Sequence, residues 1–176
     1  MTESPRKQLL VQTLHARACT LAVAALVVLG AGLAPGPAAG AADSADPVDA
    51  KLVAFGGAKM KLSDLRGQPL LLKLWATWCL PCREQARILH ELAPELESRG
   101  VAVLAVDLGE AKGVVERFLA DEPSAYPVAL DRGQVLARLF DVPELPALVH
   151  LDAEGRLVGV HRGLAQREDV LSLLGD

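Results

Sequence analysis

The residues best suited to chemistry are two cysteines, Cys79 and Cys82, which lie two residues apart. An apolar run at 70–74 precedes them, and a helix-like segment at 84–96 follows. The first turn of a helix has unpaired backbone N–H groups and the positive end of the macrodipole. In such a place a thiol pKa falls from ~8.5 to between ~3.5 and ~7.5. The spacing therefore predicts a reversible dithiol–disulfide switch, with Pro81 tolerated in a turn that needs no N–H.

Two other interpretations of the cysteine pair are less favoured. A structural zinc site needs about four ligands, and the sequence contains no second Cys-x-x-Cys and no His-x-x-x-His. A structural disulfide between residues so close together restrains the unfolded chain very little, because the loop that it closes is short. The place of the pair between a strand-like run and a helix favours redox chemistry.

The composition is that of a globular protein without a basic surface. Of the 176 residues, 51% are hydrophobic, and the formal net charge is -4. The absence of a basic run argues against nucleic acid as a partner. The length predicts one domain after an N-terminal extension. The third cysteine, Cys19, falls in that extension, so the domain itself contains only Cys79 and Cys82.

Residues 1–41 have the pattern of a signal peptide or an N-terminal membrane anchor. A basic, polar start is followed by residues 18–34, which carry no charge, and by Ala-Gly-Ala at 39–41, a small-x-small cleavage pattern. The apolar run is short against the ~20 residues that span a bilayer comfortably. Cleavage is therefore favoured over anchoring, and the anchor stays open as the alternative.

Both alternatives place the rest of the chain outside the cytoplasm, in the periplasm or secreted, and the N-terminal segment is the only expected membrane contact. Residues 42–47 are small and acidic, and are expected to form a linker. The predicted domain then occupies residues 48–176.

The pattern of apolar residues in that domain alternates between strands and helices. Residues 51–55 and 58–62 form a predicted N-terminal hairpin about Gly56-Gly57. A buried strand is expected at 70–75 and one long helix at 81–99. Further strands are expected at 101–106, 127–130, 147–151 and 156–161, and further helices at 112–121, 133–140 and 166–174. The order predicts an α/β fold with a mixed sheet flanked by helices.

The domain resembles the thioredoxin fold and, within it, the TlpA/ResA-like extracytoplasmic thiol–disulfide oxidoreductases. Trp-Cys-x-x-Cys at 78–82 is specific to the fold, and Ser-Asp-Leu-x-Gly at 63–67 points to the subgroup. The motifs that match in order are 61–67, 72–83, 101–106 with Gly109-Glu110, 126–131, 140–146 and 151–155. The resemblance implies a thioredoxin-like fold with a central mixed β-sheet.

The resemblance also implies roles for site residues. Cys79 is the attacking, more exposed thiol and Cys82 the buried resolving thiol. Pro146 matches the cis-proline that packs beside the disulfide in this family. The substrate groove is then expected to be formed by Trp78, Pro81, Leu145 and Pro146.

The function that the resemblance implies is an enzyme that exchanges disulfides with protein thiols and disulfides outside the cytoplasm. It needs no organic cofactor and no metal, and takes electrons from a membrane or periplasmic donor. The subgroup suggests a reductant that serves cytochrome c maturation or copper-site assembly.

Three residues near the motif are candidates for tuning the thiols. Gln85 stands three residues after Cys82, where members of the subgroup carry a glutamate, and Glu84 points about 100° away from it on a helix. Lys73 interrupts the apolar strand, where thioredoxin carries a buried acid. It is either a lysine whose head reaches solvent at a sheet edge or a partly buried ammonium near Cys82.

Other polar residues are interpreted as structural. His90, His150 and His161 do not have the spacing of a metal-ligand set and are expected to be surface or strand histidines. The acidic residues after the second buried strand are expected to form a solvated face rather than an acid pair. They are Asp107, Glu110 and Glu116.

Two other function classes are open. Cys79 and Cys82 are soft ligands that suit Cu(I), so a copper metallochaperone module is the main alternative, although no Met-rich tract supports it. A thiol peroxidase lacks its separate peroxidatic cysteine in a Pro-x-x-x-Thr-x-x-Cys setting.

Overall fold

A computed structural model describes residues 50–175 of the chain. The expected signal peptide or anchor at 1–41 and the linker at 42–47 lie outside the described residues, so they stay predictions. Among the described helices, none has both the length and the apolar character needed to cross a membrane.

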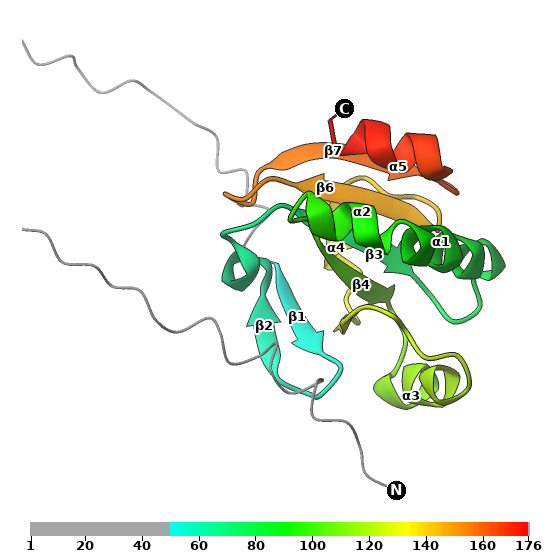
Figure 1. The fold of residues 1–176 in the computed structure, drawn as a ribbon. Helices are drawn as coiled ribbons and strands as arrows, with labels where there is room; N and C mark the ends of the chain where they lie inside the picture. Colours follow the sequence, from blue (N-terminus) through cyan, green and yellow to red (C-terminus); the bar gives the residue numbers. More distant parts are fainter. Residues whose placement is uncertain (1–49, 176) are drawn as a thin grey trace, which may run out of the picture. The chain divides into compact units, whose positions relative to one another are not determined.

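The described residues form a seven-stranded mixed sheet in the order β2-β1-β5-β4-β3-β6-β7 (Figure 1). The middle strands β5, β4 and β3 are parallel to one another, and the remaining pairs are antiparallel. The strands are β1 (Lys51–Ala54), β2 (Lys59–Lys61), β3 (Leu70–Trp75), β4 (Ala102–Leu108), β5 (Val128–Asp131), β6 (Ala147–Leu151) and β7 (Leu157–Arg162). Because β3 and β4 are parallel neighbours, their carboxyl ends meet at one edge of the sheet, where the cysteine motif begins.

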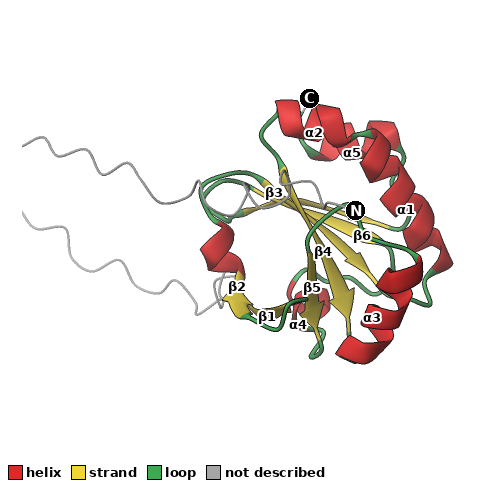
Figure 2. Ribbon diagram, turned by 60° about the horizontal axis from the view of Figure 1, so that its bottom comes forward, coloured by secondary structure: helices red, strands yellow, loops and turns green. Residues whose placement is uncertain are grey.

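Helices cover both faces of this sheet, as Figure 2 shows. Side chains of α1, α2, α3 and α5 pack on one face, and those of α4 and the 3-10 helix η3 on the other. The helices are η3 (Leu62–Leu65), α1 (Leu80–Glu91), α2 (Ala93–Ser98), α3 (Lys112–Asp121), α4 (Val135–Leu139) and α5 (Arg167–Leu173).

Strand β3 is buried along its whole length, as its continuous apolar sequence predicts. Leu71 packs with α1, α2 and α5 on one face, and Leu72 and Leu74 pack with α4 on the other. The strand therefore holds the start of the Cys-x-x-Cys segment on a rigid base.

The N-terminal hairpin consists of β1 and β2, with Lys51 opposite Lys61. Gly57 in its turn has a φ of 92°, which a side chain would strain. Its N–H donates to the Ala54 carbonyl at 2.7 Å and closes the turn.

The predicted helix at 81–99 is wrong in one respect, because it is broken into α1 and α2 at Leu92. Pro94 occupies the first turn of α2. Proline has no N–H to donate, and its ring clashes with the carbonyl four residues back. Proline therefore disfavours a single regular helix at this position, and the structure has a break here.

Candidate active site

Cys79 and Cys82 form a disulfide at the start of α1, with their Cα atoms 5.3 Å apart. Cys79 is the N-cap residue, and Cys82 lies in the first turn, where its N–H donates to the Cys79 carbonyl at 3.1 Å. This is the arrangement in which the helix dipole stabilises a thiolate. In the disulfide state Cys79 is 3% exposed and Cys82 1% exposed, so the predicted contrast between an exposed and a buried sulfur is small here.

The disulfide is flanked by exposed apolar side chains. Trp78 and Leu80, on either side of Cys79, are each 72% exposed. Pro81 lies in the first turn of α1 and is also exposed. A nearly covered disulfide with apolar neighbours suits a partner that brings apolar surface of its own. Leu80 was missed in the sequence because a leucine beside a buried apolar strand carries no signal that tells an exposed position from a buried one.

Leu145–Pro146 is a cis peptide bond, which confirms that part of the prediction. Pro146 is buried, its carbonyl accepts the Gly163 N–H at 2.9 Å, and β6 begins at the next residue. Leu145 is half-buried and packs against the cluster that contains both cysteines. Direct contact between Pro146 and the Cys79 sulfur stays a prediction.

Gln85 is fully buried on α1 and braces it to the segment between β7 and α5. Its Nε2 donates to the Ala165 carbonyl at 3.2 Å, and its Oε1 accepts the Ala165 N–H at 2.8 Å. An amide satisfies both backbone groups at once, whereas a carboxylate has no donor. The difference from the subgroup's glutamate therefore has a structural use in this chain.

The Glu84 side chain, on α1, is 42% exposed and pairs with Arg87. Its Oε2 accepts the Arg87 Nε–H at 3.0 Å, and this hydrogen bond lowers the pKa of the glutamate. A role for Glu84 in tuning the cysteines stays a prediction.

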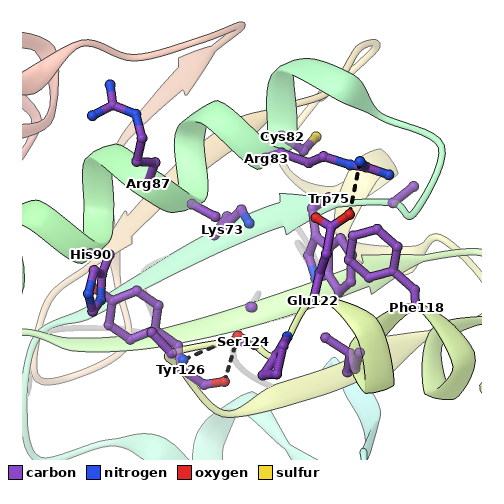
Figure 3. A pocket seen from close by; sticks show the side chains of 16 residues that line it. Lys73, Trp75, Cys82, Arg83, Arg87, His90, Phe118, Glu122, Ser124 and Tyr126 are labelled. Carbon is purple, nitrogen blue, oxygen red and sulfur yellow. Dashed lines mark hydrogen bonds and ion pairs between the residues drawn. The ribbon is translucent and has the colours of Figure 1, made fainter.

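Lys73 lies on β3, which has β4 on one side and β6 on the other, so the expected sheet-edge position is wrong. The side chain is 6% exposed, and its Nζ lies 5.3 Å from the centre of the Trp75 ring. Burial lowers its pKa to about 8. Lys73 lines the same pocket as Cys82 (Figure 3), in agreement with the partly buried alternative.

An acid pair beside the motif was missed, and the expected solvated face is wrong for Asp107. Asp107 ends up fully buried near the carboxyl end of β4, opposite Trp75 of β3. Its Oδ1 accepts the Glu110 N–H at 3.2 Å. Glu110 in turn accepts the Thr77 N–H at 2.6 Å and the Thr77 hydroxyl at 2.7 Å. The pair thus holds the loop that leads into Cys79.

The pKa values of Asp107 and Glu110 are shifted in opposite directions. Burial, followed by the hydrogen bond with Glu110 and its charge, raises the pKa of Asp107 to about 8. Burial also acts to raise the pKa of Glu110, but hydrogen bonds from Asp107 and Thr77 outweigh it, so that pKa is lowered. The two shifts therefore favour a proton on Asp107 rather than on Glu110. The signal in the sequence was the position of Asp107, two residues after Ala105 on the buried face of a strand.

Glu110→Ala should destabilise the domain by about 2 kcal/mol, because Thr77 loses two hydrogen bonds to a charged acceptor. Urea unfolding of the purified chain measures this loss. Glu116→Ala, which removes an exposed carboxylate from α3, is the matched control and should have little effect. Equal midpoints for the two variants would contradict the role given to Glu110.

His150 is buried on β6, where its Nδ1 lies 3.0 Å from the Leu173 carbonyl, as expected for a strand histidine. Within residues 50–175, no group of three or more His, Cys, Asp or Glu side chains is arranged to hold a metal ion.

Comparison with known proteins places this geometry in a family. The AhpC/TSA family model matches residues 43–160. The thiol-disulfide oxidoreductase ResA of Bacillus thuringiensis is 34% identical over 102 residues, which are 58% of this chain and 59% of that protein. ResA of Geobacillus kaustophilus is 33% identical over 114 residues, 65% of this chain and 66% of that one. The chain thus spans less than two thirds of these relatives.

A solved structure gives the same fold. The exposed lipoprotein thioredoxin Etrx1 of Streptococcus pneumoniae superposes with a TM-score of 0.63 at 26% identity, over 72% of this chain and 97% of that one. The predicted thioredoxin-like fold is confirmed, and the chain belongs to the AhpC/TSA family.

Proposed function

We propose that this protein is a thiol–disulfide oxidoreductase that exchanges its Cys79–Cys82 disulfide or dithiol with protein partners outside the cytoplasm, and that it acts as a reductant. The observation that carries the proposal is the Cys79–Cys82 disulfide at the N-terminus of α1. The ResA relatives, which are named as thiol-disulfide oxidoreductases, support it.

The reaction begins from the reduced dithiol. The Cys79 thiolate attacks one sulfur of a partner disulfide, forms a mixed disulfide and releases the other partner sulfur as a thiolate. Cys82, as a thiolate, then attacks the Cys79 sulfur and releases the second partner thiolate. The partner gains two electrons, and the domain is left with the disulfide that the structure contains.

The surroundings of the cysteines suit these steps. The α1 N-terminus favours the thiolate form of Cys79, the nucleophile in the first step. The exposed side chains of Trp78 and Leu80 provide apolar contact area for a partner beside the sulfur. A second donor, in the membrane or the periplasm, must return two electrons to the disulfide for the next cycle.

The pathway is proposed on the likeness to ResA alone. Cytochrome c maturation and copper-site assembly are the two candidate routes. The copper-carrier alternative depends on Cys79 and Cys82 themselves, since no cluster of further ligand side chains joins them among the described residues.

Trapping tests the proposed function. In a Cys19→Ala background, which removes the third cysteine, the reduced Cys82→Ala chain should form a stable mixed disulfide with insulin through Cys79. The Cys79→Ala chain should form at least ~10-fold less adduct, because it lacks the thiolate at the helix N-terminus. Non-reducing electrophoresis and mass spectrometry measure both.

The unsubstituted pair should reduce insulin without accumulating an adduct. Equal trapping by Cys79→Ala and Cys82→Ala would reverse or erase the roles assigned to the two thiols. Failure of both to trap any partner would overturn the proposal.

A further inference from the structure

A pocket of about 490 Å³ lies between α1 and the segment that joins α3 to β5. Its size is typical of sites for small organic molecules. Trp75 and Phe118 form an aromatic wall, with ring centres 5.5 Å apart, and Tyr126 lines another side (Figure 3). Cys82 also lines the pocket, so the cavity extends to one half of the disulfide on the side of α1.

Lys73 is the unusual residue in this pocket. It is more than nine-tenths buried, and no hydrogen bond or ion pair joins its amine to any other described residue. Its only polar interaction in that part of the chain is with the face of the Trp75 ring. Figure 3 shows the amine extending into the space below α1. With a pKa of about 8, the amine is mostly charged at neutral pH.

The other cations at the pocket are already paired. Arg83 forms an ion pair with Glu122 at 2.9 Å and stacks on the Phe118 ring at 5.1 Å. Arg87 pairs with Glu84 and Glu91 on the exposed side of α1. A buried charge is costly unless it is paired and hydrogen-bonded, and among these three cations only Lys73 lacks an acid.

We propose that this pocket binds a small organic carboxylate with a flat apolar body, whose acid group pairs with Lys73 and whose body packs against Trp75 and Phe118. The carboxylate supplies the acceptor that the lysine lacks, and an aromatic or similar body matches the ring walls. Neither the family match nor the relatives' names assign a ligand here. The proposal does not depend on the redox function, since binding involves no thiol exchange.

Two probes of nearly identical shape test the proposal, 2-naphthoate and its neutral amide, 2-naphthamide. The chain has only two tryptophans, Trp75 and Trp78, so their indole N–H signals in a ¹⁵N NMR spectrum of the full oxidised chain are easily assigned with Trp78→Phe. We expect 2-naphthoate to shift the Trp75 signal and to bind at least ~10-fold more tightly than 2-naphthamide.

Lys73→Met keeps an unbranched, flexible side chain that is one atom shorter, and removes its charge. It should lower the affinity for 2-naphthoate to that for 2-naphthamide, whereas Lys59→Met, at an exposed lysine of β2, should change nothing. Equal binding of the two probes by the natural chain would overturn the proposal, and so would unchanged binding by Lys73→Met. Absence of any Trp75 shift at millimolar 2-naphthoate would overturn it as well. The comparison of the two probes stands even if Lys73→Met fails to fold.

Discussion

Asp107→Asn should stabilise the domain by about 3 kcal/mol at pH 7 and should remove the fall in stability that Asp107 causes between about pH 4 and 8. The natural side chain is fully buried, and burial together with Glu110 raises its pKa from 3.8 to about 8. An acid whose pKa is raised in the folded state holds a proton that the unfolded chain releases. Stability is therefore greatest below the unfolded pKa and falls as the pH rises through the window to the folded pKa.

The magnitude follows from the width of that window. A pH of 7 is about three units above the pKa of this carboxyl in the unfolded chain. Each unit lowers the free energy of unfolding by about 1.4 kcal/mol, or roughly 4 kcal/mol in all. Burial of the neutral asparagine amide costs about 1 kcal/mol, which reduces the expected gain in stability to about 3 kcal/mol. The amide oxygen keeps the acceptor for the Glu110 N–H, so the geometry of the pair is retained.

Urea unfolding at a series of pH values from 4 to 8 measures this effect. Asp121→Asn, at an exposed carboxylate of α3, is the control and should follow the natural chain. The free energy of unfolding is plotted against pH for each chain. If the plot for Asp107→Asn runs parallel to that for the natural chain across the whole range, Asp107 does not hold a proton in the folded state.

Gln85→Ala should lower the free energy of unfolding by about 3 kcal/mol. The Ala165 N–H and carbonyl would both lose their buried partner, and each unsatisfied group costs about 1–3 kcal/mol. The cavity left by the side chain adds to this loss. Glu84→Ala, one residue away on the exposed side of α1, should change stability little, and urea unfolding compares the two.

Gln85→Glu separates the hydrogen bonds from the volume of the side chain. A protonated carboxyl can donate to the Ala165 carbonyl and accept from its N–H, but a carboxylate cannot donate. The pKa of the new carboxyl should therefore be raised, and the stability of this variant should fall as the pH rises above the ordinary range of a glutamate. Natural stability of Gln85→Glu at every pH, beside a clear loss in Gln85→Ala, would show that cavity volume, not hydrogen bonding, is what matters at this position.

The elements that position the cysteines could be predicted because local sequence and burial agree. The bounds of β3, β6 and α3 match the predicted 70–75, 147–151 and 112–121 residue for residue. The break between α1 and α2 was also within reach, since a proline such as Pro94 kinks or breaks a helix. It was missed because the apolar positions keep helical spacing across the break.

The polar network around the site could not be predicted in the same way. Gln85 meets Ala165, which lies 80 positions further along the chain. Glu110 accepts a hydrogen bond from Thr77, which lies 33 positions earlier in the chain. Such contacts depend on which strands become neighbours, and spacing along the chain does not encode this. Lys73 was hard to place for the same reason, because only the strand order removes it from a sheet edge.

The burial of the disulfide has a consequence for how electrons reach it. Cys79 and Cys82 are 3% and 1% exposed, whereas Trp78 and Leu80 beside them are 72% exposed. A small thiol gains no binding free energy from those two side chains. A protein whose thiol is surrounded by apolar surface does, at about 25 cal/mol for each Å² of apolar surface that is buried in the contact. Where that contact is kept in the transition state, it speeds exchange with proteins alone. Under the proposed function, we expect the domain to be kinetically insulated from the pool of small thiols, so that its redox state follows the proteins that dock on it.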